Sequence, residues 1–197
     1  MCSSDLCSDI EARMSERFRE IGLSRFACIV PGAAFESKRW TVEGFGSVAD
    51  HLIKTWNLPS VVVAGPGQEQ FSSEVVAAAK VKTTMLSGLS LKELMAVLRM
   101  SSLFVGNDSG PMHIAAAFNR PIVAVWGSSD ETVWHPWTRA AYRVVKNENS
   151  HSIKQIPSSE AINAVDEVLE LALEAGSAAV PQAGLVGRIS LMRDDEL

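Results

Sequence analysis

The side chains best suited to chemistry lie in one short polar stretch, residues 106–113, with the sequence Gly-Asn-Asp-Ser-Gly-Pro-Met-His. The apolar residues 103–105 before it have strand character, and the alanine-rich residues 114–117 after it favour a helix. Asp108 or Ser109 is positioned to cap that helix, and the proline that follows is compatible with its first turn. The stretch therefore predicts a buried strand, a tight turn and the start of a helix.

A turn of this kind suits a phosphate or a diphosphate. The first N–H groups of a helix have no partner within the helix, and the helix dipole is positive at that end. His113 falls in the first helical turn, so its imidazole can face the same site. The alternative is an ordinary strand and helix in which Asp108 acts only as a cap, a role worth about 1 kcal/mol. Spacing alone leaves both interpretations open.

The composition is that of a globular protein with a hydrophobic core. The chain has 197 residues, 47% hydrophobic and 21% charged, which fits one domain of ordinary size. A formal net charge of -5 and the lack of a basic stripe in the sequence argue against nucleic acid as the main partner. Apolar runs such as residues 122–126 are far shorter than a membrane span, so we expect no transmembrane segment.

The cysteines and carboxylates give no pattern typical of a metal site. Cys2, Cys7 and Cys28 do not have metal-ligand spacing, and an odd number of cysteines does not suggest a disulfide framework. The sequence also has no compact D-x-D pair. We therefore expect no metal ligands and a reducing compartment, the cytoplasm.

The chain divides into three predicted parts. Residues 1–22 form a lead-in, in which an apolar stripe predicts a linker helix over residues 9–22. Residues 23–175 form the main domain, and residues 176–197 are expected to be a poorly ordered tail. Residues 2–6 are what the end of a common sequencing adapter would encode, so we expect this start to be artefactual and the natural protein to extend upstream. A natural disordered N-terminus is the alternative.

Strand and helix patterns alternate about five times within the main domain. Apolar runs predict strands, and helical stripes with a threonine cap at Thr41 predict the helices between them. The helix after the turn at residues 65–70 is expected to run to about Lys80. At residues 90–93 we interpret the S-x-x-E spacing as one residue out of register, so we expect no capping box there. The alternation predicts an α/β fold with a Rossmann-like parallel sheet and helices on both faces. Its polar loops should meet at the carboxyl edge of the sheet: residues 31–40, 65–70, 106–113 and 127–137.

The glycine turn at residues 65–70 is not a dinucleotide fingerprint. The G-x-G-x-x-G pattern would need a third glycine where the chain has Gln70. A nicotinamide or flavin cofactor is therefore not expected.

The same loops resemble glycosyltransferase family 9, which includes the ADP-heptose:lipopolysaccharide heptosyltransferases. The resemblance is colinear from about residue 27 to residue 137. The matching motifs are Pro31-Gly32-Ala33 with Lys38-Arg39-Trp40, Gly65-Pro66-Gly67, Leu89-Ser90-Leu91 with Glu93-Leu94, Asn107-Asp108-Ser109-Gly110-Pro111-Met112-His113-Ile114-Ala115-Ala116-Ala117, Arg120-Pro121, and Trp126-Gly127 with Asp130.

This resemblance implies a function for the chain. Members of the family have a two-domain GT-B fold, with the acceptor on the N-terminal domain and the nucleotide-sugar donor on the C-terminal domain, and this chain resembles the latter. It implies the donor-binding half of an inverting, metal-independent transferase, which moves a heptose or related sugar from ADP-heptose to a lipopolysaccharide-core acceptor. That acceptor would bind a missing N-terminal domain, which would also supply the general base. No cofactor is implied, and the implied location is the cytoplasm, peripheral at the inner face of the inner membrane.

The resemblance also implies roles for individual residues. Lys38 would contact the donor diphosphate and stabilise it as the leaving group, and Leu89 would lie near the nucleobase. Relatives often have an acidic residue directly after the second glycine of the turn, where this chain has Gln68 and then Glu69. The implied donor-binding residues are Lys38, Gln68, Glu69, Leu89, Asp108, Ser109, Gly110 and His113.

Two other functions remain open. The chain could be a stand-alone nucleotide-binding module without transferase activity, or part of a nucleotide-sugar epimerase, although an epimerase explains the Lys38-Arg39-Trp40 match poorly. The aromatic residues Trp134 and Trp137 are expected to pack or to form a lid over the site rather than to do chemistry.

Overall fold

The computed structural model describes residues 4–147 and 152–176. All but the first residue of the predicted tail, and the first three residues of the proposed artefactual start, lie outside these ranges. The strands are β1 (Ala27–Val30), β2 (Ser60–Val63), β3 (Thr84–Leu86), β4 (Leu103–Asn107), β5 (Ile122–Val125) and β6 (Tyr142–Val145). The helices are α1 (Ser4–Glu20), α2 (Val42–Trp56), α3 (Glu69–Ala78), α4 (Leu91–Met100), α5 (Gly110–Ala117), α6 (Glu131–Trp134) and α7 (Ser158–Glu174), with short 3-10 turns η1 (Glu36–Lys38) and η2 (Ile153–Gln155).

The strands form one six-stranded sheet in the order β3-β2-β1-β4-β5-β6. Every neighbouring pair is parallel, so all carboxyl ends lie along one edge. The chain builds outward from β1 to β3, then returns to the other side of β1 with β4. The junction of β1 and β4 is therefore the topological switch point, where open α/β sheets bind ligands. The predicted parallel α/β fold is confirmed.

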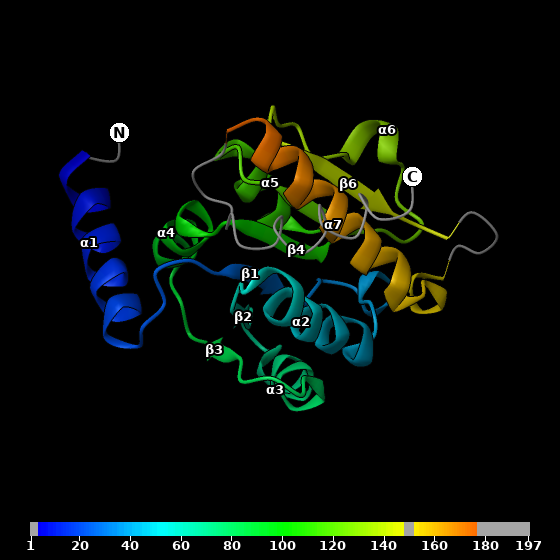
Figure 1. The fold of residues 1–197 in the computed structure, drawn as a ribbon, viewed down its shortest axis with the longest axis horizontal. Helices are drawn as coiled ribbons and strands as arrows, with labels where there is room; N and C mark the ends of the chain where they lie inside the picture. The colour runs from blue at the N-terminus through cyan, green and yellow to red at the C-terminus, as the bar shows by residue number, and fades with distance from the viewer. Residues whose placement is uncertain (1–3, 148–151, 177–197) are drawn as a thin grey trace, which may run out of the picture.

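Helices cover both faces of the sheet (Figure 1). Successive side chains of β1 alternate between two hydrophobic clusters, with Ala27 and Ile29 on one face and Cys28 and Val30 on the other. The first cluster includes residues of α2, α3 and α7, and the second includes residues of α1, α4 and α5. This burial on two faces explains why the strands read as continuous apolar runs.

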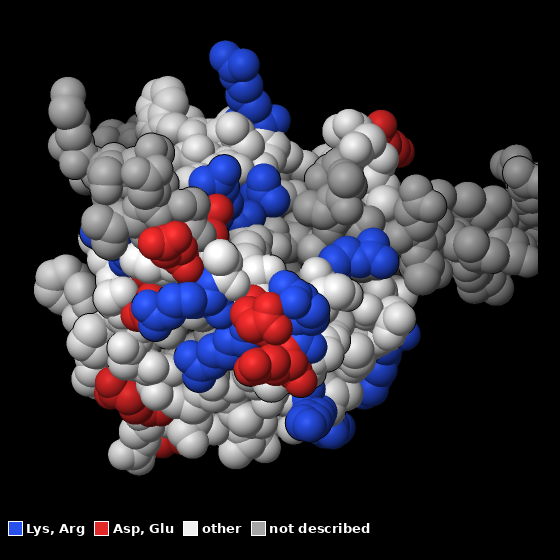
Figure 2. Space-filling view, turned by 90° about the vertical axis from the view of Figure 1, so that its left-hand side faces the viewer, with Lys and Arg blue, Asp and Glu red and all other residues white. Residues whose placement is uncertain are grey.

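Helix α1 begins earlier than the apolar stripe predicted, at Ser4 rather than residue 9. Its buried residues Met14 and Phe18 belong to the same cluster as residues of α4, and Arg99 of α4 pairs with Glu11 of α1 at 2.8 Å. The face that carries α1 shows basic and acidic side chains interspersed (Figure 2). The lead-in is thus packed onto the domain by both apolar contact and surface ion pairs.

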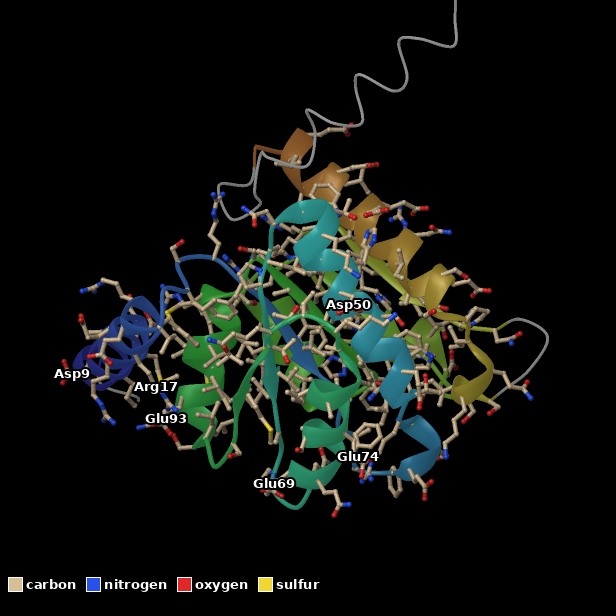
Figure 3. All side chains as sticks on the ribbon, turned by 60° about the horizontal axis from the view of Figure 1, so that its bottom comes forward. Asp9, Arg17, Asp50, Glu69, Glu74 and Glu93 are labelled. Atoms are coloured by element: carbon tan, nitrogen blue, oxygen red, sulfur yellow. The ribbon has the colours of Figure 1, made fainter. Side chains whose placement is uncertain are left out.

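The capping box that we expected to be out of register is present, so that prediction was wrong. Ser90 Oγ accepts from the Glu93 backbone N–H at 3.3 Å, and Glu93 Oε2 accepts from the Ser90 N–H at 2.9 Å. Figure 3 shows Glu93 near Arg17 of α1. The bonds from Ser90 are the main reason that the pKa of Glu93 lies below its ordinary value. At Thr41 the predicted cap is confirmed, with its hydroxyl accepting from Gly44 N–H at 3.1 Å.

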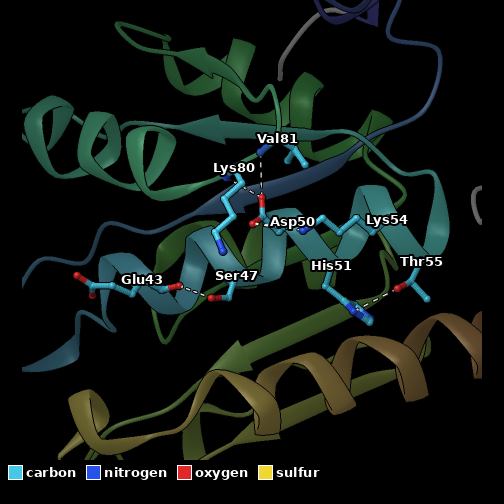
Figure 4. A network of polar contacts seen from close by, with 8 residues as sticks. All are labelled: Glu43, Ser47, Asp50, His51, Lys54, Thr55, Lys80 and Val81. Atoms are coloured by element: carbon cyan, nitrogen blue, oxygen red, sulfur yellow. Dashed lines mark hydrogen bonds and ion pairs between the residues drawn. The ribbon is translucent and has the colours of Figure 1, made fainter.

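Asp50 on α2 explains why α3 ends before residue 80, where the sequence pattern extended it. Its Oδ1 accepts from the backbone N–H groups of Lys80 and Val81 at 2.8 and 3.0 Å (Figure 4). These two groups therefore bond to a side chain rather than to the preceding helical turn. The same carboxylate lies 3.8 Å from Lys54.

Candidate functional site

Lys38 and Asp108 meet at the switch point, although they are 70 residues apart in the chain. Lys38 ends the short turn η1 that follows β1, and Asp108 directly follows β4. The Lys38 Nζ lies 2.6 Å from Asp108 Oδ2. The lysine side chain remains 32% exposed, whereas that of the aspartate is only 6% exposed. The pair thus holds an ammonium group at the carboxyl edge of the sheet, accessible from outside.

The interpretation of Asp108 as nothing more than a helix cap is wrong. The cap position of α5 belongs to Ser109, and no side chain in the described part of the chain caps this helix. Asp108 bonds to Lys38 instead. The prediction of a helix start here is confirmed, with Pro111 in its first turn and His113 two residues further on.

A polar group at the N-terminus of α5 is available to a ligand. The Ser109 hydroxyl is buried and has no hydrogen-bond partner among the described residues. A Cβ built on Gly110 would meet nothing within 4 Å, so there is open space beside the first helical residue. The hydroxyls of Ser60, Ser72 and Thr83 are also buried without a partner among the described residues, so what distinguishes Ser109 is its place at a helix N-terminus beside open space. An anionic ligand is a suitable partner at such a place.

Asn107 positions the loop that carries Lys38, and the sequence interpretation gave it no role. It is fully buried, its Oδ1 accepts from Trp40 N–H at 3.1 Å, and its Nδ2 donates to the Pro31 carbonyl at 2.7 Å. These bonds fasten both ends of the loop to the end of β4. The available signal was an amide at the end of a buried strand, where its polar atoms must find partners.

The neighbouring loop after β2 carries Gln68 and Glu69. Gln68 Nε2 donates to the Ala33 carbonyl at 2.9 Å, and its side chain crosses Gly32 so closely that a Cβ there would lie 1.6 Å from Gln68 Oε1. Glu69 begins α3, is exposed, and accepts from Gly67 N–H at 3.3 Å. The structure therefore uses Gln68 to join two loops at the carboxyl edge.

The remaining predicted residues, Leu89 and His113, follow different strands of this edge. Leu89 follows β3 and packs, half-buried, against the cluster that includes α4 and α5. His113 lies on the opposite side, with its ring centroid 6.3 Å from that of Trp134 in α6. Trp134 and Trp137 are 53% and 71% exposed. The structure thus brings Lys38 to Asp108 and the adjoining Ser109 and Gly110, with Gln68, Glu69 and Leu89 further along the edge. His113 lies in α5, with its ring beside Trp134.

Residues 4–147 and 152–176 contain neither a metal-ligand cluster nor a candidate membrane span. In these ranges, no group of three histidine, cysteine, aspartate or glutamate residues is arranged to hold a metal ion. Cys28 is a free, buried thiol, and burial raises its pKa. No helix within the same ranges has the length and apolarity needed to cross a membrane.

Comparison with known proteins gives a consistent result. The family model for glycosyltransferase family 9 (heptosyltransferase) matches residues 5–162. Lipopolysaccharide heptosyltransferase 3 of Escherichia coli is 29% identical over 174 residues, which cover 80% of this chain and 51% of that protein. The chain therefore spans about half the length of this curated relative.

Solved structures show the same fold. A glycosyltransferase family 9 protein from Veillonella parvula has a TM-score of 0.74 and 25% identity, over 81% of this chain and 51% of that one. The E. coli heptosyltransferase WaaC with ADP has a TM-score of 0.65 and 19% identity, over 73% of this chain and 44% of that one.

Proposed function

The chain belongs to glycosyltransferase family 9, and from that premise we propose that it is the donor-binding domain of a heptosyltransferase. The donor is a nucleotide diphosphate sugar, with ADP-heptose as the first candidate. The acceptor is a glycan of the lipopolysaccharide-core type. The named relatives are lipopolysaccharide heptosyltransferases, and this supports both choices.

The observation that carries the proposal is the Lys38–Asp108 pair beside the N-terminus of α5, which no described side chain caps. An ammonium group has three N–H donors, and Asp108 takes one of them. The other two can reach the oxygens of a diphosphate. The Ser109 hydroxyl, which lacks a partner among the described residues, can donate to the same group.

This arrangement can stabilise the charge that develops during sugar transfer. An acceptor hydroxyl forms a bond to the anomeric carbon, the bond from that carbon to the diphosphate oxygen breaks, and the electron pair goes to the leaving diphosphate. The ammonium group of Lys38 and the positive end of the α5 dipole lie where they can stabilise that negative charge. We propose that these protein groups suffice without a metal ion.

The remaining donor-binding residues define a path for the nucleotide. Their loops follow β4, β1, β2 and β3, which are adjacent in the sheet. Three intervals between neighbouring strands span roughly 14 Å. An extended nucleoside diphosphate can cover this distance, with its phosphates at Lys38 and its base toward Leu89. Glu69 would then be available to the ribose or the sugar.

The acceptor and the general base belong to a second domain in this proposal. The chain covers 51% of the E. coli relative, which leaves room for such a domain in the whole protein. Proton removal from the acceptor hydroxyl would take place there, and the enzyme would work at the cytoplasmic face of the inner membrane. A stand-alone nucleotide-binding module is the second candidate. An epimerase is less favoured, because the family match and the curated relatives are those of heptosyltransferases.

Calorimetric titration with ADP and, separately, UDP tests the donor site. We expect saturable ADP binding that is tighter than UDP binding. The informative variant is Ser109→Ala, because the lost hydroxyl bonds to no described protein group. It should weaken ADP binding by about 2- to 12-fold, equivalent to one hydrogen bond of about 0.5–1.5 kcal/mol, at an unchanged melting temperature.

Two results would contradict the donor site. One is a folded chain that binds neither nucleotide. The other is a Ser109→Ala variant that binds ADP as tightly as the unchanged chain. Reconstitution with the upstream half of the protein, followed by a transfer assay, separates a transferase from a stand-alone module.

A further inference from the structure

A pocket of about 680 Å³ lies beside β5 and β6, and the proposed donor site does not use it. Helix α6 and the edge strand β6, which lie at the same end of the sheet in Figure 1, both contribute to its walls. The residues that matter for its chemistry are Asp130, Glu131, Thr132, His135, Tyr142 and Lys146.

This pocket adjoins the donor site on two sides. Gly127 lines the pocket and lies close to the loop of residues 31–40, which carries Lys38. A Cβ built on Gly127 would be 3.4 Å from the carbonyl oxygen of Ser37, the residue before Lys38. On the other side, α6 carries Trp134, whose ring contacts that of His113. A molecule in the pocket would therefore lie next to the site where the diphosphate leaves.

The charges in the pocket do not favour a second phosphate. Lys146 Nζ lies 2.5 Å from Glu131 Oε2, so this cation is already paired within the pocket. Asp130 Oδ1 accepts from both the backbone N–H and the hydroxyl of Thr132, at 2.9 and 2.7 Å. These bonds lower the pKa of Asp130, mainly through the hydroxyl, and keep it anionic at neutral pH. The pocket therefore suits a ligand that is polar but uncharged.

The pocket also has aromatic rings in and beside its wall. The rings of His135 and Tyr142 are nearly parallel, at 9° and 6.3 Å between centroids. Trp137 lies against His135 at 4.4 Å and is 71% exposed. Among the described residues, His135 Nδ1 has no hydrogen-bond partner. A sugar ring has apolar C–H faces and hydroxyl groups around its edge, which match aromatic faces combined with carboxylates and hydroxyls.

We propose that this pocket holds one sugar unit of the acceptor glycan. Its walls would position the acceptor so that a hydroxyl approaches the anomeric carbon of the donor. This inference rests on the function proposed above, and it assigns part of acceptor recognition to the donor-binding domain. His135 acts here as a positioning residue through contact with the sugar ring. Trp137 lies outside the residues that line the pocket and orients the His135 ring by packing against it.

The test is a titration with deacylated, dephosphorylated lipopolysaccharide core oligosaccharide, followed by the indole N–H signals in NMR. The variants are His135→Ala and Trp137→Ala, and each should weaken oligosaccharide binding by about tenfold, the effect of losing one aromatic contact. The matched control is Val133→Ala, because Val133 is an exposed apolar residue of α6 that does not line the pocket. Because Trp137 is largely exposed, its substitution tests the proposal even if His135→Ala fails to fold.

The ADP affinity of every variant is measured in parallel, which separates the two proposals. Oligosaccharide binding that falls in both pocket variants but not in the control, at constant ADP affinity, supports the pocket. Oligosaccharide binding that is undetectable or equal in all variants, with ADP binding intact, overturns the pocket and leaves the donor site standing. Competition by inorganic phosphate, or self-association that Trp137→Ala abolishes, also overturns it. Loss of ADP binding in every sample, the unchanged chain included, contradicts the donor site instead.

Discussion

Two carboxylates in this domain hold a basic side chain from a distant segment, and they differ in what surrounds them. Asp108 meets Lys38 at 2.6 Å, and Asp166 of α7 meets His51 of α2 at 2.7 Å. Both carboxylates are largely buried, at 6% and 11% side-chain exposure. Judged by distance and burial alone, the two pairs would be assigned the same role.

The partners of each pair distinguish them. Asp166 Oδ1 also accepts from Trp56 Nε1 at 2.7 Å, and His51 lies 3.3 Å from the Thr55 hydroxyl (Figure 4). This cluster joins α2 to α7 and satisfies its members within the protein. The Lys38–Asp108 pair instead lies beside the unpartnered Ser109 hydroxyl and the open space at Gly110. The comparison indicates that the Asp166 pair stabilises the fold, whereas the Asp108 pair is available to a ligand.

The largest expected effect is on stability, from Asp166→Ala. The change leaves the Trp56 N–H and His51 without their acceptor in a buried interface. We expect a loss of about 3 kcal/mol in the free energy of unfolding, at the lower end of the range for breaking a buried pair. Urea denaturation measures it. Asp166→Asn is the matched control, because it keeps an oxygen acceptor and should lose less. If Asp166→Ala weakened ADP binding of the folded protein, that result would contradict the assignment of the Asp166 pair to fold stability alone.

An intermediate effect is expected from Asn107→Ala, which acts on the other pair without removing it. The change leaves Trp40 N–H and the Pro31 carbonyl without their buried partner. We expect a loss of about 1–3 kcal/mol in stability, together with weaker ADP binding because the Lys38 loop is released. Denaturation and calorimetry on one sample measure both. An unchanged ADP affinity would show that Asn107 does not position Lys38.

The smallest expected effect comes from Ser90→Ala, which lies outside both pairs. Loss of the capping box should reduce stability by about 1 kcal/mol at neutral pH. The bonds from Ser90 lower the pKa of Glu93 below its ordinary value of 4.5, so their contribution is present above pH 4.5 and is lost as the pH falls through the lowered value. The stability difference between the variant and the unchanged chain should therefore shrink below pH 4.5. Thermal unfolding across that range measures it, and a difference that grows in acid would contradict this account.

The sequence predicted those features that depend on local patterns. The apolar run before Asp108, the polar turn and the alanine-rich stretch sufficed for a strand followed by a helix at this point. Burial on two faces produces continuous apolar strands, and these predicted the parallel sheet. The capping box at Ser90 was also a local signal, but its register was misjudged.

The sequence did not predict the features that depend on which strands are neighbours. The parallel fold predicted that the loops carrying Lys38 and Asp108 meet at the carboxyl edge, but it did not predict that the two side chains pair. The strand order with β4 beside β1 is what brings them into contact. Asn107 bonds to residues that are far away in the chain. Similarly, α3 ends early because of Asp50 on another helix. Each of these is a tertiary contact without a local sequence signal.

The central claim is tested most directly by calorimetric titration with ADP of Lys38→Ala and His51→Ala, with the melting temperature of each. Both changes remove the basic partner of a buried carboxylate. The account predicts that Lys38→Ala weakens ADP binding by about 10- to 150-fold, equivalent to about 1.5–3 kcal/mol for a hydrogen bond to a charged group. It predicts that His51→Ala lowers the melting temperature and leaves ADP affinity unchanged. Equal ADP affinities in the two variants would contradict the assignment of Lys38 to the diphosphate.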